Sequence, residues 1–320
     1  MSKKYKIVHI SQTPLVAAPS KIAHAQRIAG HSSIAIALKD YPSALQGMFI
    51  EDFLVENEFT KPLIEKAISK ADIIHIHNDI PPEWARRLLE TNQRAKYVYQ
   101  VHSPLREGPL YVSRHQSIPL PFVLKFVVGQ FQPRIHVDHI VVPNVFLDIP
   151  SIEPRKQGEK LRVMFSPTHT RPGRWNNKHT DELDLAVKAL VALGKIEIVM
   201  PENPVSPKVL MSARRTCHVS IDEIATGGFH QVSIEGLAAG NISINKADYF
   251  SKKVFSNFSS GVLPPFLYAD GSTIAEVLSR LADDVDETVK KQYESFEYFK
   301  THLTPIKMAG IFDEAYESIQ

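Results

Sequence analysis

The chain has 320 residues, of which 43% are hydrophobic and 22% charged, and 37 basic against 35 acidic residues leave a net charge of +2. This composition is that of a globular protein, and so small a net charge gives no reason to expect a nucleic-acid footprint. The single cysteine, Cys217, excludes an internal disulfide framework, and no apolar run approaches the roughly 20 residues of a membrane-spanning helix. We therefore expect a cytoplasmic protein with at most peripheral membrane association.

The first half of the chain alternates predicted strands with predicted helices. Helical spacing of apolar residues is found at 20–28, 60–70 and 82–91. Between these segments lie β-branched runs of the kind found where helices cover both faces of a parallel sheet. These runs predict strands at 5–11, 32–38, 72–77, 96–102 and 138–144.

The segment ADIIHIHND (71–79) invites a metal-site hypothesis. Residues two apart on a strand point to one face, so His75, His77 and Asp79 would converge at the strand's end. His-x-His-x-Asp also opens the metal motif of the metallo-β-lactamase hydrolases, but that motif continues with a histidine where this chain has Ile80. We therefore favour an interpretation of the two histidines as part of a wall between domains.

The alternation of strands and helices stops at 147–160, which we interpret as an interdomain linker because it has two prolines and no apolar periodicity. It then restarts, and the tail reads as two helices separated by 302–305. Two α/β halves in series predict two Rossmann-like domains facing each other across a cleft. In the second half we predict strands at 161–166, 195–200, 217–222 and 241–245, and helices at 181–193, 206–215 and 232–240.

A basic segment precedes the helix at 181–193, for which Thr180 is the predicted N-cap. Between Arg155 and Lys178 there are seven basic residues and one acidic residue, a local charge of +6. Positive charge beside the end of a strand and the start of a helix suits a diphosphate. The alternative is a solvated basic loop.

A second candidate segment is TGGFHQVSIEGLAAGN (226–241). Gly227 and Gly228 would let backbone amides approach a ligand, and Gly240 is well suited to end the helix that follows. Glu235 is the only acidic residue of that helix, and its carboxylate could accept the two hydroxyls of a ribose. The alternative is an ordinary surface glutamate.

These segments, with KIVHIS (6–11), VHSP (101–104) and VVPN (141–144) in the first half, resemble the retaining GT-B glycosyltransferases of group 1, the glycogen-synthase-like superfamily. The resemblance implies an α/β GT-B fold with an acceptor-side domain (1–150), a donor-side domain (151–303) and a C-terminal helix (304–320) packing back on the first domain. It also implies transfer of a hexose, with retention and without a metal or cofactor. The expected donor is a UDP-sugar, and the acceptor, whether glycan, lipid-linked or protein, stays open.

The resemblance also implies roles for individual residues. Glu235 matches the second glutamate of the family's E-x7-E motif, whereas the first falls on Gly227. His102 matches the histidine at the reaction centre, and Lys178 with either Arg171 or Arg174 matches the pair that binds the diphosphate. The remaining implied positions are Gly228, Phe229 and His230 on the donor, and Pro19 and Ser20 in a glycine-free first loop, where Ser20 is expected to cap a helix.

Two other functions stay open at this point: a sugar-nucleotide epimerase of the same fold, and a non-catalytic sugar-nucleotide-binding protein. A further acidic pair, Asp284 and Asp286, is interpreted as a solvated turn between helices rather than a metal site. The last helix should bury an apolar stripe with a spacing near 3.6 residues. The stripe consists of Ile306, Met308, Ile311, Phe312, Ala315, Tyr316 and Ile319.

Overall fold

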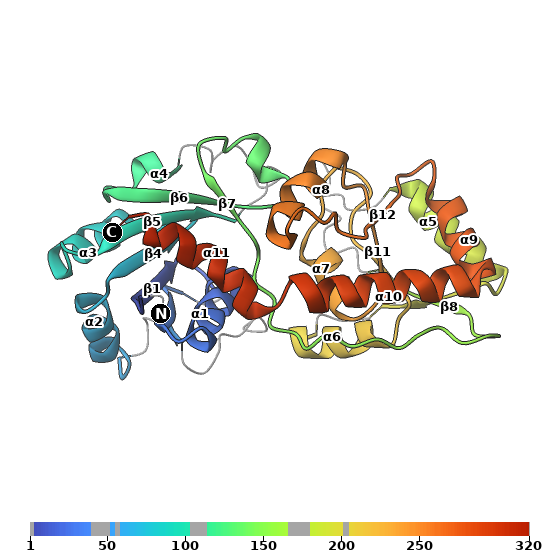
Figure 1. Cartoon of the computed structure of the whole chain (residues 1–320), viewed down its shortest axis with the longest axis horizontal. Coiled ribbons are helices and arrows are strands. Elements are labelled where there is room, and N and C mark those ends of the chain that lie inside the picture. Colours follow the sequence, from blue (N-terminus) through green and yellow to red (C-terminus); the bar gives the residue numbers. More distant parts are fainter. Residues whose placement is uncertain are drawn as a thin grey trace. The chain divides into compact units, whose positions relative to one another are not determined.

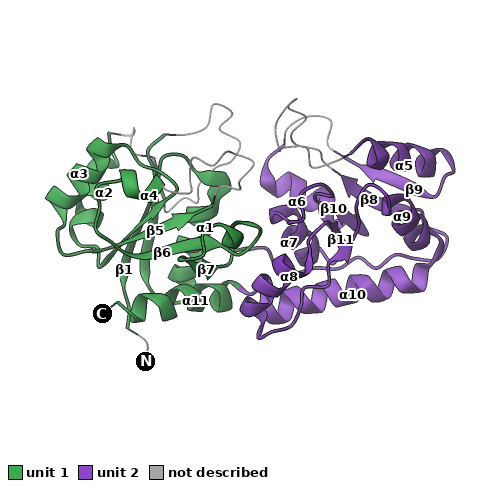
Figure 2. Ribbon diagram, turned by 90° about the horizontal axis from the view of Figure 1, so that it is seen from above, with its two compact units in different colours: residues 1–147, 305–320 green, residues 148–304 purple. Residues whose placement is uncertain are grey.

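The structure is a computed structural model that describes residues 3–39, 52–54, 58–102, 114–165, 180–200 and 205–319 (Figure 1). The chain forms two compact units (Figure 2). Unit 1 consists of Met1–Leu147 and Pro305–Gln320, and unit 2 of Asp148–Thr304. None of the described helices is long and apolar enough to cross a bilayer.

Unit 1 is built on a seven-stranded, all-parallel sheet with the order β3-β2-β1-β4-β5-β6-β7. The order reverses between β1 and β4, and ligands of such sheets bind outside the strand ends at the reversal. The strands are β1 (Lys6–Ser11), β2 (Ser32–Ala37), β3 (Phe53–Leu54), β4 (Ile73–His77), β5 (Lys96–Val101), β6 (Phe122–Val128) and β7 (Ile140–Val142). The helices are α1 (Ala18–Ile28), α2 (Lys61–Ser69), α3 (Pro82–Thr91) and α4 (Arg114–Ser117), with 3-10 turns at Leu15–Ala17 and Gln132–Arg134.

Unit 2 has a five-stranded, all-parallel sheet with the order β12-β11-β10-β8-β9, which reverses between β8 and β10. Its strands are β8 (Leu161–Phe165), β9 (Ile196–Val199), β10 (Val219–Ile221), β11 (Ile242–Asn245) and β12 (Leu267–Tyr268). Its helices are α5 (Asp181–Ala192), α6 (Pro207–Arg215), α7 (Gln231–Ala238), α8 (Tyr249–Ser256), α9 (Ile274–Asp283) and α10 (Val285–His302), with a 3-10 turn at Asn257–Ser259.

Two Rossmann-like units confirm the predicted fold class, and every strand that we predicted is present. Several of the elements that the sequence did not predict are short or follow a proline-rich stretch. β6 comes directly after IPLP, and β12 has only two residues. Apolar periodicity over so few residues does not distinguish a strand from a loop. The missed elements are β3, α4, β6, α8, α9 and β12.

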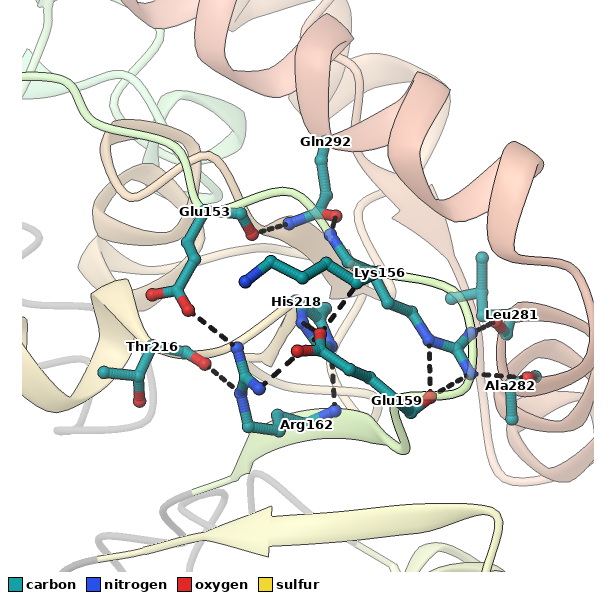
Figure 3. Close-up of polar contacts among 10 residues, drawn as sticks. Glu153, Lys156, Glu159, Arg162, Thr216, His218, Leu281, Ala282 and Gln292 are labelled. Carbon is teal, nitrogen blue, oxygen red and sulfur yellow. Dashed lines mark hydrogen bonds and ion pairs between the residues drawn. The ribbon is translucent and has the colours of Figure 1, made fainter.

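The predicted linker is packed into unit 2 over much of its length (Figure 3). The Arg155 side chain is buried and donates to the carbonyls of Leu281 at 2.7 Å, Ala282 at 2.8 Å and Glu159 at 2.8 Å. Its backbone amide donates to Gln292 Oε1 at 3.0 Å. Arg155 and the Glu153 carbonyl are therefore bonded to α9 and α10, which sequence periodicity could not indicate.

Two basic residues of the predicted +6 segment, Arg155 and Arg162, make structural contacts inside unit 2. Arg162 is the second residue of the strand β8, where it pairs with Glu153 at 3.2 Å and Glu159 at 3.8 Å (Figure 3). Arg155 is buried on the same side. Arg155 and Arg162 therefore serve the structure of unit 2.

The last helix, α11 (Pro305–Glu317), belongs to unit 1, as the resemblance implied. It packs against α1 (Figure 1), and Asp313 accepts from His31 Nε2 at 3.0 Å. Phe312 and Tyr316 are buried beside Phe126 of β6. The predicted apolar stripe is present except at its start, since Ile306 is 58% exposed.

We predict that Phe312→Ala destabilises unit 1 by about 3–5 kcal/mol, because a fully buried aromatic ring leaves a cavity. Urea unfolding monitored by the fluorescence of Trp84, in a Trp175→Phe background, measures the loss. Ile306→Ala in the same helix is the control and should change the free energy of unfolding by less than about 0.5 kcal/mol. Equal losses in the two variants would show that α11 contributes no core to unit 1.

Candidate functional site

In unit 2, two acidic side chains follow β10 at the point where the strand order reverses. The Asp222 carboxylate is buried and accepts from the His230 amide at 2.5 Å and from Ser233 Oγ at 2.8 Å. Its other oxygen lies 3.3 Å from His230 Nδ1. A carboxylate at the start of α7 is favourably placed, because the first amides of a helix carry partial positive charge. Asp222 thus determines where α7 begins.

Glu223 holds the segment from Thr226 to Gly228 by hydrogen bonds from its buried side chain. It is fully buried and accepts from the amide and hydroxyl of Thr226, each at 2.8 Å, and from the Gly228 amide at 3.1 Å. Burial raises the pKa of the Glu223 carboxyl above its ordinary range. The Gly228 amide is therefore used inside the loop, and Gly227, with φ +85°, has a left-handed conformation that favours glycine.

Phe229 and His230 have structural contacts in this unit. Phe229 is 1% exposed and packs its ring against Phe255 and Phe266, with centroids 5.3 and 4.9 Å away. His230 is the N-cap residue of α7 and has an extended backbone. Any ligand at this loop would thus meet the edge of His230 and the backbone more readily than the Phe229 ring.

Glu235 points to a buried arginine that sequence reasoning missed. Arg214, at the end of α6, is 2% exposed and donates to Glu235 Oε2 at 3.0 Å and to Ser220 Oγ at 3.1 Å. The Glu235 side chain keeps 22% exposure, and its Oε1 has no partner among the described residues. A buried guanidinium thus orients a carboxylate that keeps one oxygen for another group.

The other basic candidates of the donor side, Arg171, Arg174 and Lys178, lie outside the described residues. Thr180 caps α5 as predicted, since its side chain accepts from the Leu183 amide. Gly240, with φ +66°, comes directly after the C-cap residue of α7, Ala239, and ends the helix as predicted. The acidic pair at 284–286 is not a free turn, because Asp284 caps α10 by accepting from the Glu287 amide at 2.8 Å.

In unit 1, the loop between β1 and α1 has an unusual backbone. Leu15, Val16 and Ala17 have φ angles of 49°, 56° and 60°, a left-handed conformation that side chains with a Cβ rarely adopt. The prediction that Ser20 caps α1 is wrong, because the helix begins at Ala18 and Ser20 donates to Asp52 from within it. The sequence shows that this loop has no glycine. It did not indicate that the backbone would adopt a conformation typical of glycine.

The histidines of β4 lie inside unit 1. His75 and His77 are fully buried, so the prediction that they form an interdomain wall is wrong. Asp79 is not with them, because it pairs with Arg114 at 2.5 Å. The third member of the group is His9 of β1, and the three rings have possible metal-ligand atoms within 4.8 Å of one another. His9 Nδ1 and His77 Nε2 are already hydrogen-bonded at 2.9 Å, and a cation would have to displace that bond.

His102 follows β5 and is held on both sides of its backbone. Its amide donates to Asn78 Oδ1 at 2.7 Å, and its carbonyl accepts from Gln132 Nε2 at 3.1 Å. Its ring Nε2 lies 2.8 Å from His77 Nδ1. Burial lowers the pKa of His102 to about 3, so the imidazole is neutral near pH 7. Such a ring can position a group by hydrogen bonding but brings no positive charge.

Comparisons with known proteins identify the fold. No model of a protein family matches the sequence, and no curated protein matches it significantly. A glycosyltransferase from Rickettsia africae is 15% identical, covers 99% of both chains and has a TM-score of 0.60. An α-glucosyltransferase solved with UDP-glucose and DNA containing an abasic site is 11% identical, with a TM-score of 0.61 over 98% of this chain and 99% of that one.

A sucrose-phosphate synthase from Thermosynechococcus elongatus is 12% identical, covers 99% of both chains and has a TM-score of 0.57. At identities this low, the likeness concerns the fold alone. The chain has the GT-B fold of solved glycosyltransferases over nearly its whole length.

The left-handed loop before α1 generates a prediction. Val16→Gly should stabilise unit 1 by up to about 1 kcal/mol, because glycine adopts this conformation without the clash of a Cβ. Val16 is 44% exposed, so little packing is lost. Calorimetry should show a melting temperature higher by about 2–4 °C. Leu63→Gly is the control: this residue is 54% exposed in α2 and should lose roughly 0.5–1 kcal/mol. If Val16→Gly lowered the free energy of unfolding as much as Leu63→Gly does, the left-handed loop would not be strained.

Proposed function

We propose that the protein is a glycosyltransferase that moves a hexose from a nucleoside-diphosphate sugar, a UDP-sugar in the first instance, to a glycan, lipid-linked or protein acceptor. The observation that carries this proposal is the pair of Glu235 and Arg214 in the second Rossmann-like unit. A carboxylate that is held by a buried guanidinium and keeps one free oxygen is suited to the two hydroxyls of a ribose. The GT-B fold supports the proposal.

In this proposal the donor lies along the loop of Gly227 to His230, with Glu235 on the ribose. Lys178 and either Arg171 or Arg174 bind the diphosphate. When the bond from the sugar to the diphosphate breaks, negative charge builds up on the leaving phosphates. Fixed cations stabilise that charge most where water is excluded. The acceptor side belongs to unit 1, where Pro19 and Ser20 lie in the first turn of α1.

His102 has a positioning role at the sugar in this proposal. A neutral imidazole can accept a hydrogen bond from a sugar hydroxyl or donate one to a ring oxygen. The retaining outcome means that the acceptor attacks on the face from which the diphosphate leaves, and a donor phosphate oxygen takes its proton. No residue of this chain then has to act as the general base.

Glu235→Gln should weaken UDP binding by about 10- to 100-fold, because a charge-assisted hydrogen bond to the ribose becomes a neutral one. Isothermal titration with UDP measures the change. Glu294→Gln removes an exposed carboxylate of α10 from the same unit and should leave the affinity unchanged. Unaltered UDP affinity in a folded Glu235 variant would remove this residue from the site.

Lys178→Ala should weaken binding of UDP-glucose more than binding of uridine, since uridine has no diphosphate for the ammonium group to contact. The expected loss for the sugar nucleotide is about 10- to 100-fold. Lys188→Ala, at an exposed position of α5, is the control. Equal losses for both ligands would place Lys178 away from the phosphates.

The glycine at position 227 favours a second candidate, a non-catalytic protein that binds a sugar nucleotide, because no carboxylate stands where the family's first glutamate would contact the sugar. Incubation with a UDP-sugar alone, and then with a panel of acceptors, separates the candidates. Release of UDP or a glycosylated product supports transfer, an epimer supports an epimerase, and tight binding with no product supports the non-catalytic protein.

A further inference from the structure

Three buried side chains of unit 1 and the partly buried His102 form one line of hydrogen bonds. Gln26 Oε1 lies 2.8 Å from His9 Nε2, and His9 Nδ1 lies 2.9 Å from His77 Nε2. His77 Nδ1 then lies 2.8 Å from His102 Nε2. Gln26, His9 and His77 are each 0% exposed, so water does not offer alternative partners. Both ring nitrogens of the two middle histidines are used in the line.

The direction of the line follows from its first member. Gln26 Oε1 also accepts from Ser33 Oγ at 2.8 Å, and Gln26 Nε2 donates to the Tyr316 hydroxyl at 3.5 Å. In the structure the amide oxygen faces His9 and Ser33, and the amide nitrogen faces the Tyr316 hydroxyl. An amide oxygen carries no hydrogen, so His9 Nε2 must be the donor in that bond.

The remaining bonds follow one after another because each ring is neutral. Burial lowers the pKa of His9 to about 4 and that of His77 well below its ordinary value. A neutral imidazole has one N–H, so His9 Nδ1 is an acceptor and His77 Nε2 must donate to it. His77 Nδ1 is then an acceptor, and His102 Nε2 must donate to it. The last ring is thereby left with its lone pair on Nδ1.

We propose that Gln26, through His9 and His77, holds His102 as the Nε2–H tautomer and so presents Nδ1 as a hydrogen-bond acceptor. In the donor complex a sugar hydroxyl would donate to His102 Nδ1, a step that rests on the proposed function. Gln26, His9 and His77 are then positioning residues that act through His102.

The tautomers can be measured without any substrate. Two-bond ¹⁵N–¹H correlation spectra of histidine-labelled, untagged full-length protein distinguish Nε2–H from Nδ1–H rings. The expected result is Nε2–H for His9, His77 and His102, assigned by their single substitutions. An Nδ1–H form of His102, or one tightly bound cation per chain held by His9, His75 and His77, would overturn the proposal.

Gln26→Met keeps the length of the side chain and removes the acceptor, so the His102 signal should shift to a mixture of tautomers. Ser33→Ala removes the other hydrogen bond to the same amide oxygen and should leave the signal unchanged. If Gln26→Met does not fold, His9→Phe interrupts the line one step later with a ring in the same place. An unchanged His102 tautomer in a folded variant of either kind would refute the relay.

Kinetics test the consequence for catalysis. Gln26→Met should lower kcat by about tenfold or more, since it misorients a group at the reacting sugar, while KM for the donor changes less than about twofold. Ser33→Ala should keep both constants. An unaltered kcat would overturn the positioning role. If the unmodified protein has no transferase activity, the proposed function fails, whereas the tautomer measurement still decides the relay.

Discussion

A polar side chain that leaves water must find its hydrogen-bond partner inside the protein, and this constraint shapes both units at the ends of their parallel strands. The sheets are covered by helices on both faces, so polar side chains at the ends of β1, β4 and β10 cannot form hydrogen bonds with water. In unit 1 the result is a line of neutral imidazoles. In unit 2 it is a pair of carboxylates, Asp222 and Glu223, that bind the backbone of the next loop.

The two solutions have different chemical consequences. A buried carboxylate that accepts several amides fixes a loop in one conformation, and the loop then offers few amides of its own to a ligand. A line of imidazoles fixes tautomers instead. In the proposed relay, the hydrogen bond to Gln26 sets the tautomer of His102, which follows β5. The pair of Arg214 and Glu235 differs from both, because the guanidinium binds one oxygen of the carboxylate and leaves the other oxygen for a partner.

The sequence predicted the frame well because the frame depends on local patterns. Apolar runs between helical segments identified both Rossmann-like units, Thr180 was a correct N-cap, and the stripe from Met308 to Tyr316 was a correct buried face. The errors concern residues whose surroundings come from distant segments. Arg155 looked like part of a linker and Ser20 like a cap, and each is bonded to side chains or carbonyls far along the chain.

The sequence by itself thus determined the order of the elements, the two-unit fold and the motif positions at strand ends, since backbone periodicity and capping act over a few residues. Only the tertiary structure decided which polar groups meet. The bonds from His9 to Gln26, from His77 to His102 and from Arg214 to Glu235 join residues 17 to 25 positions apart. No local sequence pattern indicates these contacts, because they form only when separate strands and helices pack side by side.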